Sequence, residues 1–188
     1  MQHEAMITTL KSIKLYGMAQ AVDELASQGS PAYQSAQEVL GTLLKAEMAE
    51  REVRSIAYQM KASKFPVYRD LASFDFSQSV VNEALIRQLH RCEFLDQVHN
   101  VVLVGGPGTG KTHLATALGV QAVQHQHRRV RYFSTIELVN ALELEKAAGK
   151  QGQLASRMMY ADLVILDELG YLPFSQSGGA LLFHFLGK

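Results

Sequence analysis

One glycine-rich stretch, GGPGTGKT, decides the fold of this chain. It comprises Gly105, Gly106, Pro107, Gly108, Thr109, Gly110, Lys111 and Thr112. The spacing G-x-x-x-x-G-K-[ST] is that of a phosphate-binding P-loop, or Walker A motif. Glycines let the backbone N–H groups turn toward phosphate oxygens, and the helix that should follow adds its positive dipole end. We expect Lys111 to bind the β- and γ-phosphates as a catalytic cation and the Thr112 hydroxyl to bind Mg²⁺. The stretch therefore predicts ATP and Mg²⁺ as cofactors.

The segments around this loop predict alternating strands and helices. Residues 101–104 read VVLV, a short apolar run typical of a strand that is covered on both faces. A helix is predicted at 114–124, and further strands at 130–133 and 163–166. Between those strands, Ser134 and Glu137 form a capping box that should open another helix. The alternation predicts an α/β fold, a P-loop NTPase with a parallel sheet and helices on both faces.

An acidic pair, Asp167 and Glu168, ends the third apolar run. An aspartate at this place can hold Mg²⁺, usually through water, and the neighbouring glutamate can polarise an attacking water as a general base. A solvated acidic pair at a strand end is the alternative. The pair suits an ATPase that uses water better than a GTPase or a small-molecule kinase.

The chain before the sheet is predicted to be helical. Apolar residues recur at helical spacing in 15–25, and Gln28-Gly29-Ser30-Pro31 breaks the pattern. Ser35 and Glu38 form a capping box that predicts a helix start. We expect a helical N-terminal region, residues 1–64, and an ATP-binding domain, residues 65–188.

A bridge of short elements is expected between these two parts. Phe65-Pro66 should stop the preceding helix, and residues 80–95 read as helical. Phe74 and Phe76 could pack against an adenine, and packing in the core is an equally weighted alternative.

Composition restricts the classes of function. Lysine plus arginine number 18, as do aspartate plus glutamate, so the net charge is zero and any contact with DNA must come from a local patch. The densest basic stretch, residues 125–132, could touch a nucleic-acid backbone, but a solvated turn is the favoured reading. The single cysteine, Cys92, allows no intrachain disulfide. Without a signal-like or membrane-spanning run, a cytoplasmic protein with no membrane contact is expected.

At this level of detail the chain resembles a known family. It is similar to the IstB-like helper ATPases of insertion sequences, a branch of the AAA+ proteins close to the DnaC helicase loaders. The segments that carry the resemblance are Leu15 to Ala19, Lys64 to Pro66, Phe74 to Phe76, Gly105 to Thr112, Asp167 to Pro173 and Leu181 to His184.

The resemblance implies a role in transposition. Such helpers bind ATP, assemble on duplex DNA with little sequence preference, bend it, and deliver the target to a partner transposase. Hydrolysis of ATP then resets the assembly. The N-terminal helices would serve self-association as a homo-oligomer, or the partner. A helicase loader of the DnaC type and a non-catalytic interaction remnant are the alternatives.

The family's pattern also implies elements beyond Lys188. They comprise two further strands, a polar residue that positions the attacking water, and an arginine that reaches a neighbour's nucleotide. In the sheet order 5-1-4-3-2 that the resemblance implies, the fourth strand separates 101–104 from 163–166. The chain therefore looks truncated after the third strand, and unpaired buried backbone groups cost about 1–3 kcal/mol each. We expect weak nucleotide binding and little or no hydrolysis.

Overall fold

The structure is a computed structural model that describes residues 2–169 and 175–187. The chain divides into two compact units, Met1–Ser55 and Ile56–Lys188, and the division falls inside a long helix. The expected boundary at residue 64 lies near the end of the same helix. No described helix has the length and apolar character needed to cross a membrane.

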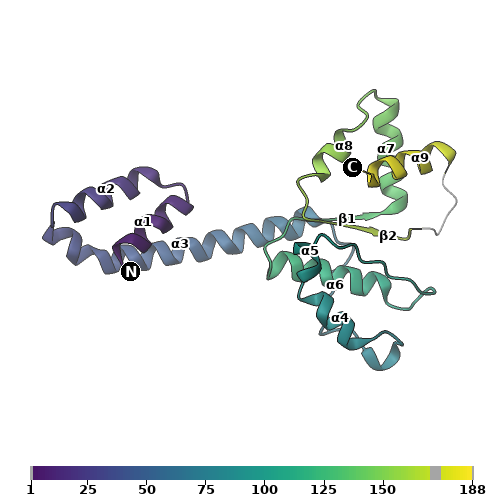
Figure 1. Ribbon diagram of the computed structural model, residues 1–188, viewed down its shortest axis with the longest axis horizontal. Coiled ribbons are helices and arrows are strands. Elements are labelled where there is room, and N and C mark those ends of the chain that lie inside the picture. The colour runs from purple at the N-terminus through teal and green to yellow at the C-terminus, as the bar shows by residue number, and fades with distance from the viewer. Residues whose placement is uncertain (1, 170–174, 188) are drawn as a thin grey trace. The chain divides into compact units, whose positions relative to one another are not determined.

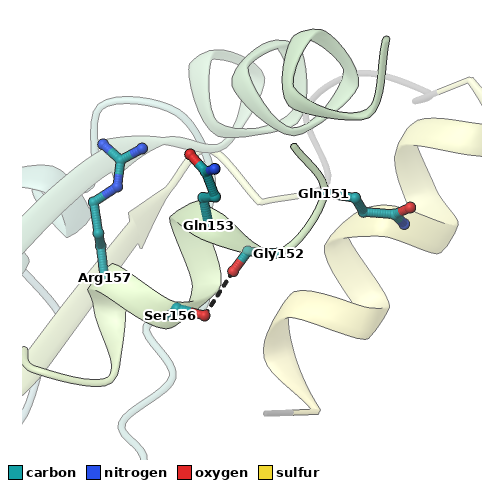
Figure 2. A pocket seen from close by; sticks show the side chains of 5 residues that line it. All are labelled: Gln151, Gly152, Gln153, Ser156 and Arg157. Carbon is teal, nitrogen blue, oxygen red and sulfur yellow. Dashed lines mark hydrogen bonds between the residues drawn. The ribbon is translucent and has the colours of Figure 1, made fainter. Parts of the chain in front are cut away.

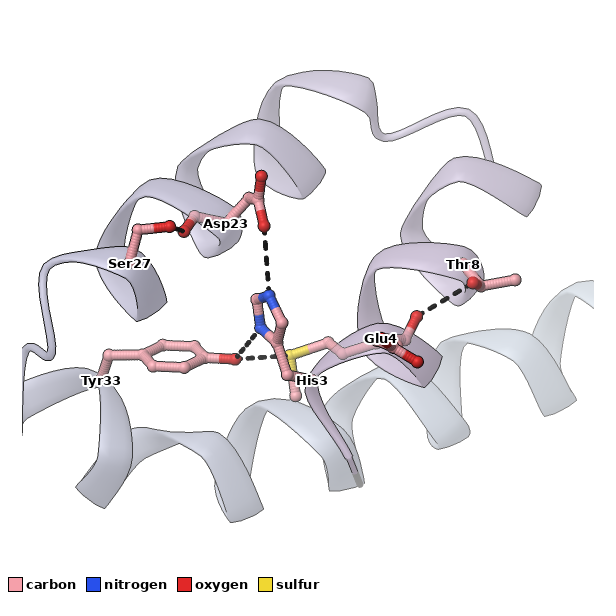
Figure 3. Close-up of polar contacts among 7 residues, drawn as sticks. His3, Glu4, Thr8, Asp23, Ser27 and Tyr33 are labelled. Atoms are coloured by element: carbon pink, nitrogen blue, oxygen red, sulfur yellow. Dashed lines mark hydrogen bonds and ion pairs between the residues drawn. The ribbon is translucent and has the colours of Figure 1, made fainter.

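The first unit is built from helices α1 (His3–Ser12), α2 (Tyr16–Ser27) and the first part of α3 (Pro31–Ser63). The core residues that pack between these helices are Met6, Leu10, Ala19, Val22, Tyr33 and Leu44. Figure 3 shows the imidazole of His3 between two polar partners. Its Nε2 lies 3.2 Å from Asp23 Oδ1, and its Nδ1 lies 3.3 Å from the Tyr33 hydroxyl. These contacts tie α1 to both neighbouring helices.

Helix α3 begins one turn earlier than the capping box predicted. Gly29, with φ of 63°, ends the preceding turn, and Pro31 is the first helical residue. Proline suits this position because it has no N–H to leave unpaired and its φ is already helical. Ser35 therefore lies inside the helix, where its hydroxyl donates to the Pro31 carbonyl at 3.1 Å. The prediction of a start at Ser35 was wrong, whereas the stop before Phe65-Pro66 is confirmed.

The second unit contains a parallel sheet with helices on both faces (Figure 1). Within the described residues the sheet consists of β1 (Val130–Ser134) and β2 (Leu163–Asp167). Tyr132 is paired with Ile165, and Ser134 is paired with Asp167. Helix α6 (Lys111–Gln124) covers one face, and α7 (Thr135–Ala147) and α9 (Gln176–Leu186) cover the other.

The alternation of strand side chains explains this three-layer arrangement. Successive residues of a strand point to opposite faces. Val130 and Ile165 pack with Val123 of α6, whereas Phe133 and Leu166 pack against the cluster of α7 and α9. Both faces of each strand are apolar, as the sequence indicated. The predicted α/β P-loop fold is confirmed.

Residues 101–104 are not a strand, contrary to the prediction. They run up to the glycine loop without a strand assignment, and the described strands pair only with each other. Val102 and Val104 are 78% and 90% exposed, whereas Val101 and Leu103 are half-buried. A strand exists only where a neighbour accepts its hydrogen bonds, and no described segment lies beside this one as a partner strand. Residues 101–104 are apolar as predicted, but no described strand forms hydrogen bonds with them.

Short helices fill the region between α3 and the loop. A 3-10 turn spans Phe76–Gln78, and the helix predicted at 80–95 is two helices, α4 (Glu83–His90) and α5 (Glu93–Asp96). They are separated at Cys92, whose φ is 62°. A left-handed residue cannot continue a right-handed helix, which accounts for the break. Helix α8 (Gln153–Met158) lies between α7 and β2 in sequence.

Candidate functional site

The glycine loop leads directly into α6. Gly108 and Gly110 have φ of 73° and 86°, a region that glycine enters without steric cost, and Gly110 caps the helix that begins at Lys111. Lys111 Nζ donates to the Gly106 carbonyl at 2.7 Å, and Thr109 Oγ1 donates to the same oxygen at 2.9 Å. The ammonium group is thus folded over the loop, next to an exposed hollow of about 250 Å³ lined by residues 108–112.

The end of β2 meets the start of α6 through a short hydrogen bond. Thr112 Oγ1 donates to Asp167 Oδ2 at 2.6 Å, although the two residues are far apart in sequence. The Tyr132 hydroxyl donates to the same carboxylate oxygen, also at 2.6 Å, and the Glu168 N–H donates to Oδ1 at 2.9 Å. Burial opposes ionisation of Asp167, but these donors and the charge of Lys111 outweigh it and hold its pKa below the usual value. Asp167 is therefore an ionised carboxylate with defined orientation.

Glu168 lies beside this cluster and is exposed. Its φ is 61°, and its Oε2 accepts a hydrogen bond from Ser134 Oγ at 3.2 Å. Helix α7 begins where predicted, but Ser134 makes no side-chain capping bond to the described residues. The predicted Ser134–Glu137 capping box is therefore wrong in detail, because the Ser134 hydroxyl is directed to the acidic pair instead.

The aromatic rings of the bridge pack beside the loop. Phe74 and Phe76 meet edge to face with centroids 4.9 Å apart, in a cluster with Leu71 and Ile86. The core reading of these rings is what the structure shows. Phe74 also lies against the glycine loop, since a Cβ built on Gly110 would be 2.6 Å from its ring.

His113 links the same bridge to α6. Its Nε2 lies 2.9 Å from the Asp70 carbonyl, and its ring meets Phe74 edge to face at 5.2 Å. The helix that begins with Lys111 is therefore held by residues upstream of the loop.

The arginines of the basic stretch 125–132 have partners within the protein. Arg128 pairs with Asp96, and Arg129 binds both carboxylate oxygens of Asp162, each at 3.1 Å. Arg131 donates to the Val130 carbonyl at 2.8 Å. The pairing of these arginines within the protein agrees with the favoured reading of a turn rather than with a nucleic-acid contact.

The side chains at the loop fit a magnesium ion that is carried with nucleotide phosphates. No described group of three or more His, Cys, Asp or Glu side chains is placed to hold a metal. Thr112 and Asp167 offer one hydroxyl and one carboxylate. Mg²⁺ keeps several waters and typically takes one or two protein oxygens plus phosphate oxygens, so this small donor set suits it.

The structure brings the predicted site residues together, and it adds several that the sequence did not single out. Lys111, Thr112 and Asp167 adjoin through α6 and β2, with Glu168 next to them. The additional residues are Tyr132, Ser134, Thr135 and His113. Thr135 Oγ1 donates to the Asp167 carbonyl at 2.6 Å. The Gly170-Tyr171-Leu172-Pro173 part of the resemblance lies outside the described residues.

The glycine loop leads into a helix, and its Thr112 is hydrogen-bonded to Asp167 at the end of β2. These two features define the class of P-loop nucleotide-binding proteins. Comparison with known proteins makes the assignment more specific. Residues 8–188 match the family described as IstB-like ATP binding protein. The chain belongs to this family, and its function is that of an ATP-binding protein associated with insertion sequences.

Individual relatives agree with the family assignment. The chain is 32% identical over 180 residues to the insertion sequence IS21 ATP-binding protein of Pseudomonas aeruginosa, covering 95% of this chain and 68% of the relative. It is 34% identical over 173 residues to the insertion sequence IS5376 ATP-binding protein of Geobacillus stearothermophilus, covering 91% and 68%. It is 32% identical over 188 residues to the insertion sequence IS232 ATP-binding protein of Bacillus thuringiensis subsp. berliner, covering 98% and 74%.

Proposed function

We propose that this chain is a transposition helper that binds Mg²⁺ with ATP at residues 105–112, assembles on DNA and aids a partner transposase in choosing its target. The observation that carries the proposal is the 2.6 Å bond from Thr112 Oγ1 to Asp167 Oδ2. It joins the phosphate-binding loop to the acidic strand end, which is the pairing that phosphoryl chemistry in this class requires.

Each site residue has a role in this proposal. The N–H groups of the loop and Lys111 bind the phosphates, and Mg²⁺ supplies electrostatic stabilisation of the phosphate charge. Thr112 and Asp167 would hold the ion. Glu168, whose carboxylate is exposed, would be the general base for an attacking water in any hydrolysis of ATP that this chain retains.

A surface for DNA is provided by the segment after α7. A hollow of about 480 Å³ is lined by Gln151, Gly152, Gln153, Ser156 and Arg157. Figure 2 shows Gln153 and Arg157 projecting from the same side of α8. The described lining contains side-chain amide and guanidinium donors and no carboxylate, and its Ser156 hydroxyl already donates to the Gly152 carbonyl at 2.9 Å. The half-buried Glu145 carboxylate nearby accepts from the N–H groups of Gly152 and Leu154 at 3.0 and 2.7 Å. The exposed glutamine amides and the Arg157 guanidinium suit phosphate oxygens, and contacts of this kind are independent of the base sequence.

The partner in transposition is proposed from the relatives, which are named as insertion sequence proteins. Their names favour a transposition helper over a helicase loader. Homo-oligomer formation or transposase binding is assigned to the first unit. Val39, Leu43 and Val53 of α3 are each about 60% exposed there, and apolar side chains at such positions are typical of contact surfaces.

The test has two parts, and nucleotide comes first. A fluorescent ATP analogue with Mg²⁺ should bind the wild-type chain saturably, and Lys111→Ala should abolish that binding. Lys146→Ala, which removes an exposed lysine from the last turn of α7, is the matched control and should bind normally. Equal binding by Lys111→Ala and the wild type would refute the assignment of the loop.

DNA binding is measured second, by fluorescence anisotropy of a labelled duplex in the presence of saturating ATP. Arg157→Ala should weaken binding about equally for unrelated sequences and lower its dependence on salt. Lys61→Ala, an exposed cation on α3, serves as the control. If the ATP-saturated wild-type chain shows no affinity for duplex DNA, the helper function is rejected even where nucleotide binds.

A further inference from the structure

We infer that Tyr132 is a positioning residue, which holds the Asp167 carboxylate in the orientation in which that carboxylate and Thr112 receive Mg²⁺. The inference rests on the proposed binding of Mg²⁺ with ATP. It concerns a side chain outside the glycine loop and the acidic pair, and it starts from the 2.6 Å hydrogen bond between the tyrosine hydroxyl and Asp167 Oδ2.

The strand register explains why this tyrosine reaches the carboxylate. In the parallel pair, Tyr132 lies beside Ile165, and Ser134 lies beside Asp167. Because side chains alternate between faces, Tyr132 and Asp167 are on the same face of the sheet, offset by two residues along the strands. This is the face that α6 covers, and α6 carries Thr112 at its start. A long aromatic side chain spans that offset.

The hydrogen bonds of Asp167 show that Tyr132 orients the carboxylate and does not itself bind the cation. Oδ2 accepts from both Thr112 and Tyr132, and Oδ1 accepts from the Glu168 N–H. Each carboxylate oxygen has about two acceptor sites, so Oδ2 is fully occupied and Oδ1 keeps one site free. The Thr112 hydroxyl oxygen retains lone pairs for a cation while its hydrogen points at Asp167. Tyr132 binds no cation in this scheme, and it fixes the rotation of the carboxylate independently of the metal.

The tyrosine is itself held rigidly. Its ring meets Phe65 edge to face with centroids 6.3 Å apart, and Phe65 in turn lies against Gly119 of α6. A fixed donor on a ligating carboxylate is the kind of outer contact whose removal typically lowers metal affinity about 10–100-fold.

The decisive variant is Tyr132→Phe, which removes the hydroxyl and keeps the ring. Binding of a fluorescent ATP analogue is measured while Mg²⁺ is titrated, and again in excess chelator. We expect the Mg²⁺ concentration at half-saturation to rise about tenfold or more. Metal-free nucleotide binding and the thermal unfolding midpoint should stay close to the wild-type values. Tyr160→Phe is the control, because Tyr160 is 72% exposed, and it should leave every value unchanged.

Two results would overturn the inference. One is an unchanged Mg²⁺ midpoint in Tyr132→Phe. The other is an equal loss of metal-free binding, which would mean that the tyrosine only supports the fold. Should Tyr132→Phe fail to fold, the variant Phe65→Leu is used instead. This variant keeps the Tyr132 hydroxyl but removes the ring that packs against Tyr132. A smaller rise in the Mg²⁺ midpoint is then expected, and no rise counts against the inference. A wild-type chain without Mg²⁺-dependent binding would reject the proposed function itself, before any variant is compared.

Discussion

Replacing Gly110 by alanine should destabilise the second unit much more than the same replacement at Gly108. Both glycines have positive φ, 86° and 73°, so both variants place an alanine in left-handed backbone. An added Cβ at Gly110 would lie 2.6 Å from the ring of Phe74, whereas at Gly108 it would meet no described atom within 4 Å. Gly108→Ala is therefore a matched control for the backbone effect.

The magnitude follows from these two contributions. The left-handed conformation costs an alanine about 1–2 kcal/mol, and this cost applies to both variants. The overlap with Phe74 adds about 1–3 kcal/mol, which is typical of overpacking. The loss of freedom in the unfolded chain on changing glycine to alanine is the same at both positions and cancels in the comparison. The free energy of unfolding should thus differ by about 1–3 kcal/mol between the two variants.

The single cysteine supplies an assay specific to this unit. Cys92 is 3% exposed and belongs to the same unit as the loop. Brief pulses of a thiol reagent at increasing urea concentration would label Cys92 only in molecules whose second unit has opened. With a urea dependence of about 1–3 kcal/mol per molar, a 2 kcal/mol difference moves the midpoint by about 1 M.

A second replacement tests the cause of the difference. Removing the ring with Phe74→Ala abolishes the overlap, so Gly110→Ala combined with Phe74→Ala should be less destabilised than the sum of the single variants by about 1–3 kcal/mol. Equal midpoints for Gly110→Ala and Gly108→Ala, or strict additivity in the double variant, would refute the reasoning.

Three further predictions concern packing, pH and thiol chemistry. In Gly119→Ala the new Cβ would lie 2.7 Å from two apolar side chains, so the thermal midpoint should fall. The overpacking cost of about 1–3 kcal/mol exceeds the roughly 1 kcal/mol gained in helix propensity. The hydrogen bonds from Arg129 hold the pKa of Asp162 below its usual value, so the pair stabilises the fold above the unfolded-state pKa of about 4 and loses that effect as pH falls through the lower folded value. Thermal melts of Asp162→Asn between about pH 5 and pH 3 should show a flatter pH dependence than the wild type. Burial raises the pKa of the Cys92 thiol to about 11, so alkylation of the native chain at about pH 8 should be slow, and urea should restore the rate of an ordinary thiol. Fast alkylation of native protein would contradict that burial.

The parts of the fold that the sequence predicted are those with a local physical signal. The glycine spacing identified the loop, and the strand before Asp167 was evident from its apolar run. The glycine loop and the acidic strand end each predicted a Mg²⁺ ligand, Thr112 and Asp167, but the hydrogen bond that joins the two side chains came only from the structure. Helix α3 shows a limit of such signals, since the capping box predicted a start at Ser35 and the helix begins at Pro31, which the sequence pattern assigned to the break before it. The earlier start prevailed because Gly29 already ends the preceding turn.

Contacts that depend on register or on partners could not be predicted in the same way. The bond between Tyr132 and Asp167 depends on the register of the two parallel strands, which places Asp167 two positions beyond the residue paired with Tyr132. Neither strand alone specifies that register. Ser134 had a good capping sequence, but the nearby carboxylate of Glu168 received its hydroxyl instead. For the basic stretch a contact with nucleic acid stayed open beside the favoured solvated turn, because the sequence does not show that Arg129 lies against Asp162.

The run at 101–104 has a consequence for the behaviour of the chain in concentrated solution. Val102 and Val104 expose their apolar side chains to water from a segment that pairs with no described strand. Such a segment is a template on which a strand of another molecule can form hydrogen bonds and bury the same side chains. Self-association through this edge would compete with productive handling of the protein, especially at low net charge, where electrostatic repulsion between molecules is weak. Contacts between the exposed Val102 and Val104 side chains of different molecules should therefore favour self-association as the protein concentration rises.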